Sequence, residues 1–145
     1  MMKKIGTIAL ALCVSVLAVP VGAADFDGSE PLLCASVDVM ECDAGGECFR
    51  ATADSIGAPQ FYRVNFKEKK IIGISQSKKG PPSQIERMES VDGKLILQGA
   101  EDAVEGIRDG VGWSLAISEE TGRMVLTASG DDVGFVIFGA CTPLN

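Results

Sequence analysis

Histidine is absent from all 145 residues, and aromatic side chains are scarce, with one tryptophan, one tyrosine and six phenylalanines. Because histidine is the commonest general base in enzymes, its absence removes the usual serine and cysteine catalytic sets. Zinc is disfavoured as well, since the cysteines lack the CxxC-type spacing of a zinc site without histidine. No G-x-S-x-G elbow or phosphate-binding glycine loop occurs. The sequence therefore predicts a protein that is not an enzyme, with no catalytic residues, no metal and no cofactor.

Basic residues are also in the minority. The chain has 13 lysines and arginines against 20 aspartates and glutamates, which gives a formal net charge of -7. A surface with this excess of negative charge repels the phosphates of nucleic acids and the head groups of anionic lipids. We therefore expect no nucleic-acid partner, and no membrane partner once the N-terminal segment described next is removed.

The sequence has a single long apolar run, residues 5–19, which carries no charge. Lysines precede it and small residues follow it, ending at Ala23 and Ala24. This pattern is typical of a secretory signal peptide, and the run is short for a membrane span of about 20 residues. We expect a signal peptide over 1–23, cleaved after Ala23 or Ala24. A single β domain over 24–145 would then work in the periplasm or outside the cell.

Four cysteines remain after the predicted cleavage: Cys34, Cys42, Cys48 and Cys141. Disulfides persist in the oxidising compartments that exported proteins reach, so we expect two bridges. Four cysteines allow three connectivities, and spacing alone leaves all three open. We favour Cys42 with Cys48, because two adjacent glycines between them can reverse the chain. Cys34 would then pair with Cys141.

Short segments of alternating polarity dominate the rest of the chain, and they predict strands because side chains alternate between the two faces of a sheet. Expected strands lie at 61–66, 71–74, 94–98, 113–118, 123–128 and 135–138. Asp92-Gly93 predicts a type I′ turn. The proline- and glycine-rich stretch 78–83 predicts a loop. Residues 84–91 fit either a helical turn or a strand, and the acidic residues 25–30 suggest a disordered end of the mature chain.

Seven or eight short strands joined mostly by tight turns predict an all-β protein. We expect a small antiparallel up-and-down barrel stapled by disulfides, because barrel closure removes exposed strand edges. A β-sandwich is the alternative. Pairing of Cys34 with Cys141 suits the barrel, in which the first and last strands are neighbours.

The last expected strand is apolar at every position from Phe135 to Phe138. It is either a central strand roofed by the loop of residues 100–112, or a surface for a partner or a second copy. The candidate interaction surface comprises Phe135, Val136 and Phe138, together with Asp131 and Asp132 of the preceding turn. The sequence leaves the oligomeric state open.

Three stretches carry a resemblance to other exported proteins: E-C-D-x-G-G-x-C at 41–48, the segment 95–99, and 131–135. With them, the chain resembles an uncharacterised group of small periplasmic β-barrel proteins of Gram-negative bacteria, which brings no known activity. Its general plan is similar to that of the periplasmic inhibitors of c-type lysozyme. Their S-G-x-x-Y loop is missing, because the only tyrosine, Tyr62, has no Ser-Gly before it, so no inhibitory residue is implied.

Two functions are compatible with these features. The first is a non-enzymatic exported binding protein, such as an inhibitor or immunity-type factor whose acidic surface meets a basic protein target. The alternative is a lipocalin-like carrier that holds a small apolar ligand inside the barrel. An interior filled by Trp113, Phe66 and Met124 would argue against a carrier.

Overall fold

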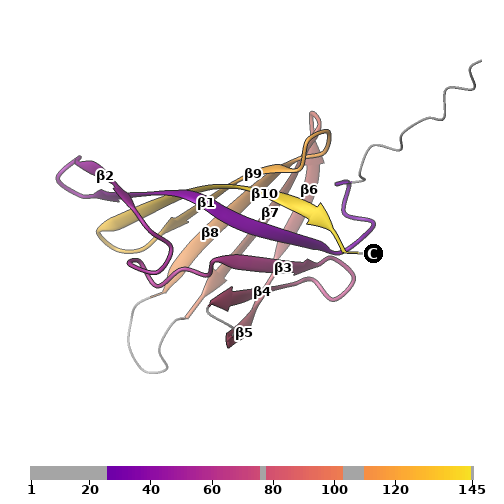
Figure 1. Ribbon diagram of the computed structural model, residues 1–145, viewed down its shortest axis with the longest axis horizontal. Helices are drawn as coiled ribbons and strands as arrows, with labels where there is room; N and C mark the ends of the chain where they lie inside the picture. Colours follow the sequence, from indigo (N-terminus) through magenta and orange to yellow (C-terminus); the bar gives the residue numbers. More distant parts are fainter. Residues whose placement is uncertain (1–25, 76–77, 103–109, 145) are drawn as a thin grey trace, which may run out of the picture.

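The computed structural model describes residues 26–75, 78–102 and 110–144 (Figure 1). These ranges contain strands and no helix, and hence no helix that could span a membrane. The ten strands are β1 (Leu32–Asp43), β2 (Cys48–Ala51), β3 (Phe61–Asn65), β4 (Lys70–Ser75), β5 (Lys78–Gln84), β6 (Arg87–Val91), β7 (Lys94–Glu101), β8 (Val111–Ser118), β9 (Arg123–Ser129) and β10 (Val133–Pro143).

Nine of these strands form one antiparallel sheet in the order β5-β4-β3-β1-β10-β9-β8-β7-β6, and β2 pairs with β1 as a hairpin. The sheet curls into a half barrel, as the ribbon of Figure 1 shows. The predicted all-β, disulfide-stapled architecture is confirmed. The strand count is larger than the seven or eight expected, with ten in the described part of the chain.

Part of this difference comes from β5, where the prediction of a loop at 78–83 is wrong. This segment pairs with β4, with Pro82 opposite Ile72 and a register shift between Ile72 and Ile74. Proline has no N–H to donate, so it is tolerated where a strand lies at the edge of a sheet, as β5 does. The ambiguous segment that follows contains the strand β6.

The two ends of the sheet are joined by the chain itself between β5 and β6. The Ile85 N–H donates to the Lys69 carbonyl at 2.8 Å, beside β4, whereas the Glu86 N–H donates to the Gln98 carbonyl of β7 at 2.9 Å. Two adjacent residues therefore bond to opposite ends of the strand order. This change of partner holds the curled sheet around an interior.

The turn at Asp92 and Gly93 has the conformation that the sequence predicts. Their φ angles are 49° and 74°, and positive values at both central residues are the mark of a type I′ turn. The turn connects β6 to β7, whose pairing begins with Val91 opposite Lys94.

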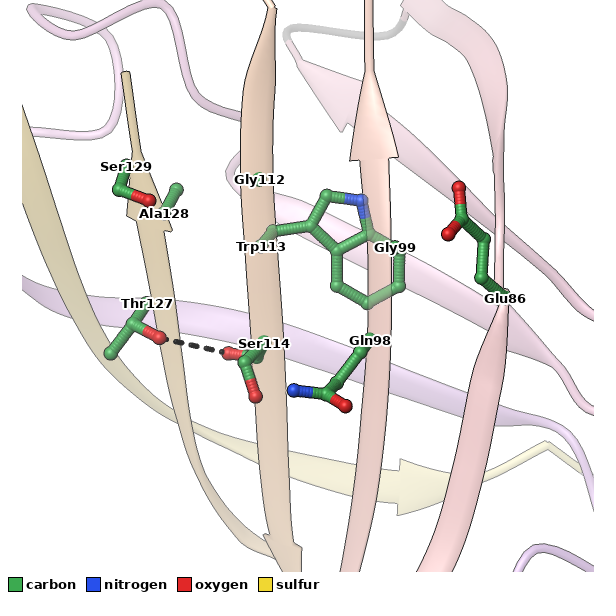
Figure 2. Close-up of a pocket in the computed structure, with 9 residues that line it drawn as sticks. All are labelled: Glu86, Gln98, Gly99, Gly112, Trp113, Ser114, Thr127, Ala128 and Ser129. Carbon is green, nitrogen blue, oxygen red and sulfur yellow. Dashed lines mark hydrogen bonds between the residues drawn. The ribbon is translucent and has the colours of Figure 1, made fainter. Parts of the chain in front are cut away.

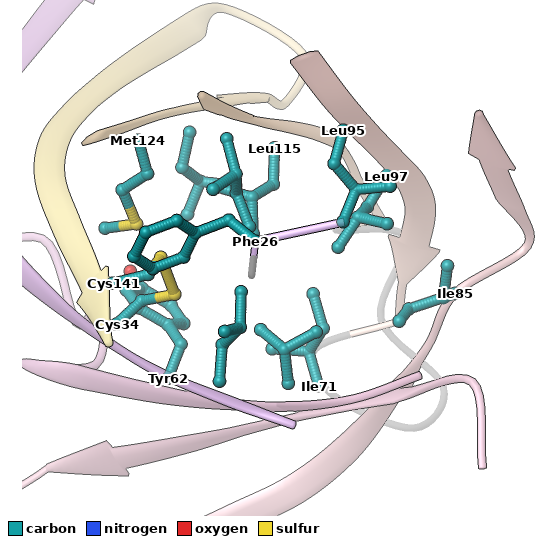
Figure 3. Packing of buried hydrophobic residues seen from close by; sticks show 14 of the residues in the cluster. Phe26, Cys34, Tyr62, Ile71, Ile85, Leu95, Leu97, Leu115, Met124 and Cys141 are labelled. Carbon is teal, nitrogen blue, oxygen red and sulfur yellow. A yellow bond between two sulfur atoms is a disulfide. The ribbon is translucent and has the colours of Figure 1, made fainter. Parts of the chain in front are cut away.

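A continuous core fills one part of the interior (Figure 3). Phe26 belongs to this core, with 6% of its surface exposed, so the expectation of disorder at 25–30 is wrong from Phe26 onward. Its ring lies against Gly122, where an added Cβ would come within 2.5 Å of the ring carbons. Other buried members include Leu32, Val64, Phe66, Leu95, Leu97, Ile117 and Met124.

Two disulfides staple the sheet with the connectivity that we favoured from the sequence. Cys34 on β1 is bonded to Cys141 on β10, directly opposite in register, with 3.9 Å between the Cα atoms. Cys42 is bonded to Cys48 across the β1–β2 hairpin, with 4.1 Å between the Cα atoms. The first bridge is buried in the core, and two disulfides are typical of a protein from an oxidising compartment.

We predict unequal losses of stability when the two bridges are removed. Replacing Cys34 and Cys141 by alanine frees a loop that spans 107 residues, which costs about 4 to 5 kcal/mol on the chain-entropy model. Replacing Cys42 and Cys48 frees a span of 6 residues and costs about 2 kcal/mol. Denaturant unfolding followed by circular dichroism measures both, and equal losses would contradict this ranking.

Candidate functional site

The core does not fill the whole half barrel, and a cavity of about 600 Å³ lies beside it. Strands β8, β9 and β10 form one wall, and β3, β4, β5 and the loop before β3 form the other. Most lining side chains are apolar; they include Ile56, Pro59, Ile71, Pro81, Val111, Trp113, Leu115, Leu126, Phe135 and Ile137.

The strand register explains which side chains of β8, β9 and β10 face the cavity. Phe135 on β10 pairs with Ala128 on β9, and Ala128 pairs with Trp113 on β8. Residues opposite one another in a sheet point to the same face, so all three face the cavity, which each of them lines. Ala128 carries the smallest side chain of the three. A larger side chain at this position would therefore occupy part of the cavity.

Trp113 also connects β8 to β5 and so helps to hold the curled sheet closed. Its indole Nε1 donates to the Ser83 hydroxyl of β5 at 3.0 Å, and its ring lies against Gly99 of β7 (Figure 2). A Cβ at Gly99 would come within 2.4 Å of both the Trp113 ring and the Gln84 carbonyl oxygen. Only glycine lets the tryptophan reach across β7 to β5.

The loop between β2 and β3 closes one side of the cavity. The Thr52 N–H donates to the Ser55 hydroxyl, and the Ser55 N–H donates to the Thr52 hydroxyl. The Ala58 N–H donates to the Ala53 carbonyl at 2.8 Å. Pro59 packs on β4 at Gly73, where an added Cβ would lie 2.3 Å from the Pro59 Cγ. These contacts give the loop a defined path along the cavity.

Tyr62 is one of four polar side chains among the described residues that line the cavity, with Ser75, Ser83 and Glu101. It lies on β3, 7% exposed, and its hydroxyl has no hydrogen-bond partner among the described residues. Burial raises the pKa of the Tyr62 phenol, the nearby Ser36 hydroxyl lowers it, and the negative charge of Glu101 raises it further. The phenol therefore stays protonated at neutral pH.

A second hollow, of about 480 Å³, is wide open and lies on the outer side of β7, β8 and β9. Figure 2 shows its polar side chains, with the Thr127 hydroxyl donating to the Ser114 carbonyl at 3.4 Å. Among the described residues, no three histidine, cysteine, aspartate or glutamate side chains are grouped so as to hold a metal ion.

The candidate surface residues are divided between the two faces of β10. Phe135 lines the cavity, whereas Phe138 pairs with Val125 on the outer face and is 44% exposed. Val136 alternates with Phe135, so it faces outward and is half-buried. Because β10 is a central strand between β1 and β9, its inner face is covered by the sheet's own curl. Residues 103–109 of the expected roof lie outside the described residues.

Asp131 and Asp132 are exposed in the turn between β9 and β10. This turn lies beside the β1–β2 hairpin, because Val133 pairs with Asp43 near the hairpin tip. The carboxylates of Asp43, Asp131 and Asp132 therefore gather at one end of the molecule. Phe135, by contrast, faces the cavity.

Sequence reasoning missed the residues that shape the cavity. The sequence patterns place Tyr62 in a strand and name Trp113 only as a residue that could fill the interior, and neither Ala128 nor Gly99 stands out by its pattern. The available signal was a small residue within a strand of otherwise large apolar residues, which indicates a close approach or an unfilled space.

Comparisons with known proteins leave the chain without an assigned family. No family model matches it, and a search of the curated proteins finds no match.

We predict that alanine at Gly99 loosens the closure of the half barrel. The Gly99→Ala variant forces Trp113 and the β5 backbone apart and lowers the free energy of unfolding by about 1 to 3 kcal/mol. The matched control is Gly112→Ala in β8, where an added Cβ meets only the Ser129 hydroxyl at 3.9 Å. Denaturant unfolding checks both variants. A Gly99→Ala protein as stable as the control would contradict the role given to this contact.

Proposed function

We propose that the protein is exported and works as a binding protein, without catalysis, by holding a small apolar molecule inside the half barrel. The observation that carries this proposal is the cavity of about 600 Å³. Ligand sites commonly have volumes of about 300 to 1,000 Å³, largely apolar walls and a few placed polar groups. An interior filled by Trp113, Phe66 and Met124 would have argued against a carrier. Phe66 and Met124 are packed in the core, but Trp113 lines the unfilled cavity.

Export is supported by two features. The first 24 residues have the order of charge, apolar run and small residues found in secretory leaders. The two disulfides fit an oxidising compartment such as the periplasm. A carrier in that compartment meets its ligand outside the cytosol.

We predict that filling the cavity abolishes binding of a neutral apolar probe. Phenylnaphthylamine should bind to the wild-type protein and quench the emission of Trp113, the only tryptophan. The Ala128→Leu variant fills the gap between Trp113 and Phe135 and should weaken binding by at least about tenfold, or 1.4 kcal/mol. Fluorescence titration of the folded variants measures the effect.

The control for this experiment is Ala140→Leu, which makes the same change at an exposed position of the neighbouring strand β10. It should bind the probe as the wild type does. Equal affinities in all three proteins would place the probe outside the cavity and contradict the proposal.

A basic protein partner is the second candidate, and the β1–β2 hairpin favours it. The hairpin extends beyond the rest of the sheet (Figure 1), and the disulfide between Cys42 and Cys48 clips it. At its tip the Asp43 carboxylate accepts from the Glu47 N–H at 3.2 Å, and Phe49 is 48% exposed. A rigid acidic hairpin beside Asp131 and Asp132 suits a cationic surface.

We predict that this end of the molecule controls any binding to a cationic protein. With a c-type lysozyme as the probe, affinity should fall as salt rises. Asp131→Asn with Asp132→Asn should weaken it by about twofold to thirtyfold, as expected for two exposed ion pairs of about 0.2–1 kcal/mol each. The control pair, Glu119→Gln with Glu120→Gln, removes the same charge at the opposite end of β9. Calorimetry that finds equal effects of the two pairs, or no binding, would reject this candidate.

A further inference from the structure

Glu101 brings a negative charge to the wall of the largely apolar cavity. It pairs with Val111 on β8, and both residues line the cavity. Leu97 and Gly99 precede it in β7 at intervals of two residues, and side chains at this interval point to the same face of a sheet. The carboxylate of Glu101 therefore belongs to the inner face of the half barrel.

The position of Glu101 also locates the mouth of the cavity. Along the inner face of β7, Leu97 is fully buried, whereas Glu101, the last residue of the strand, is exposed. Ser75, the last residue of β4, lines the cavity as well and is half-buried. The cavity thus opens to water where β4 and β7 end. A carboxylate at this opening stays hydrated and avoids the large cost of burying a charge.

The indole ring of Trp113 lies beside this carboxylate on β7. The ring covers Gly99, as Figure 2 shows, and an added Cβ at Gly99 would come within 2.4 Å of it. Glu101 is the next inward-facing residue, about 7 Å further along the strand. A cation is attracted to an aromatic face when it lies within about 6 Å of the ring centre. One cationic group at the mouth can therefore contact both the ring and the carboxylate.

The charge of Glu101 also reaches the opposite wall. Burial raises the pKa of the Tyr62 phenol on β3, and the negative charge of Glu101 raises it further. The carboxylate therefore acts across the width of the cavity, between the walls that would hold a ligand.

We propose that the cavity binds an apolar molecule that carries one ammonium group, with the apolar body between the two walls and the ammonium at the mouth, beside the Glu101 carboxylate. This inference rests on the proposed ligand-binding function and adds the charge of the ligand. The ammonium remains in contact with water at the mouth, so it gains the attraction of the carboxylate and the indole ring without being fully desolvated.

The test compares two probes of the same shape, (naphthalenylmethyl)trimethylammonium and neopentylnaphthalene, in which a neutral carbon replaces the charged nitrogen. Their affinities for the full mature protein are measured by displacement of phenylnaphthylamine. The quantity compared is the ratio of the two affinities. In Glu101→Gln this ratio should fall by about two- to fivefold, the contribution of one exposed ion pair. Glu101→Lys, which reverses the charge, should lower the ratio further.

The matched control is Asp102→Asn. Asp102 is the next residue, is exposed, and is not among the described residues that line the cavity. Both variants remove one negative charge, so they reduce equally the general attraction of a chain with a formal net charge of -7 for cations. The Asp102→Asn protein should therefore keep the wild-type ratio.

The outcomes distinguish this inference from the proposal on which it rests. If neither probe binds, the ligand-binding function itself is wrong, and the inference fails with it. If both probes bind but Glu101→Gln keeps the wild-type ratio, the cavity is a binding site and the selection of a cation by Glu101 is refuted. An equal loss in Asp102→Asn would refute it too, because the effect would then come from the charge of the whole chain.

Discussion

The structure depends on one segment that changes its hydrogen-bond partner within two residues. Ile85 bonds beside β4 and Glu86 bonds to β7, so the strands at the two ends of the sheet are held together by the chain. Trp113 strengthens this closure through its hydrogen bond to Ser83. Without this closure of the sheet, the two walls of the cavity would belong to opposite ends of an open sheet.

The interior has a packed part and an unfilled part, and they have different roles. Phe26 and the bridge between Cys34 and Cys141 consolidate the packed part, where the large apolar side chains meet. A disulfide that closes a long loop stabilises chiefly by restricting the unfolded chain. The folded state can then tolerate an unfilled space, which costs stability through lost packing contacts. Binding sites are often kept at such a cost.

Local patterns predicted the local structure well. Alternation of polarity located β3, β8 and β9, and Asp92-Gly93 identified its turn, because these features depend on neighbours in the sequence. Gly45-Gly46 likewise indicated the pairing of Cys42 with Cys48. The strand β5 was missed because its prolines and glycine normally disfavour strands, and only its edge position makes them acceptable.

The candidate site could not be predicted in the same way, because it depends on register across many strands. Whether Phe135 faces a cavity and Phe138 faces outward follows from the pairing of β10 with β9, which no pattern within β10 reveals. The buried hydroxyl of Tyr62 likewise depends on groups from β1 and from the loop before β3. Such long-range placement arises from the closure of the whole sheet.

Xenon binding in crystals tests most directly whether this closure encloses an unfilled apolar space. Xenon enters dry apolar cavities and has no polar requirement. We expect crystals kept under xenon pressure to show the gas between Ile71, Leu115 and Phe135, and none around Phe26 in the packed part. Walls in mutual contact at that place, with no xenon between them, would contradict the account.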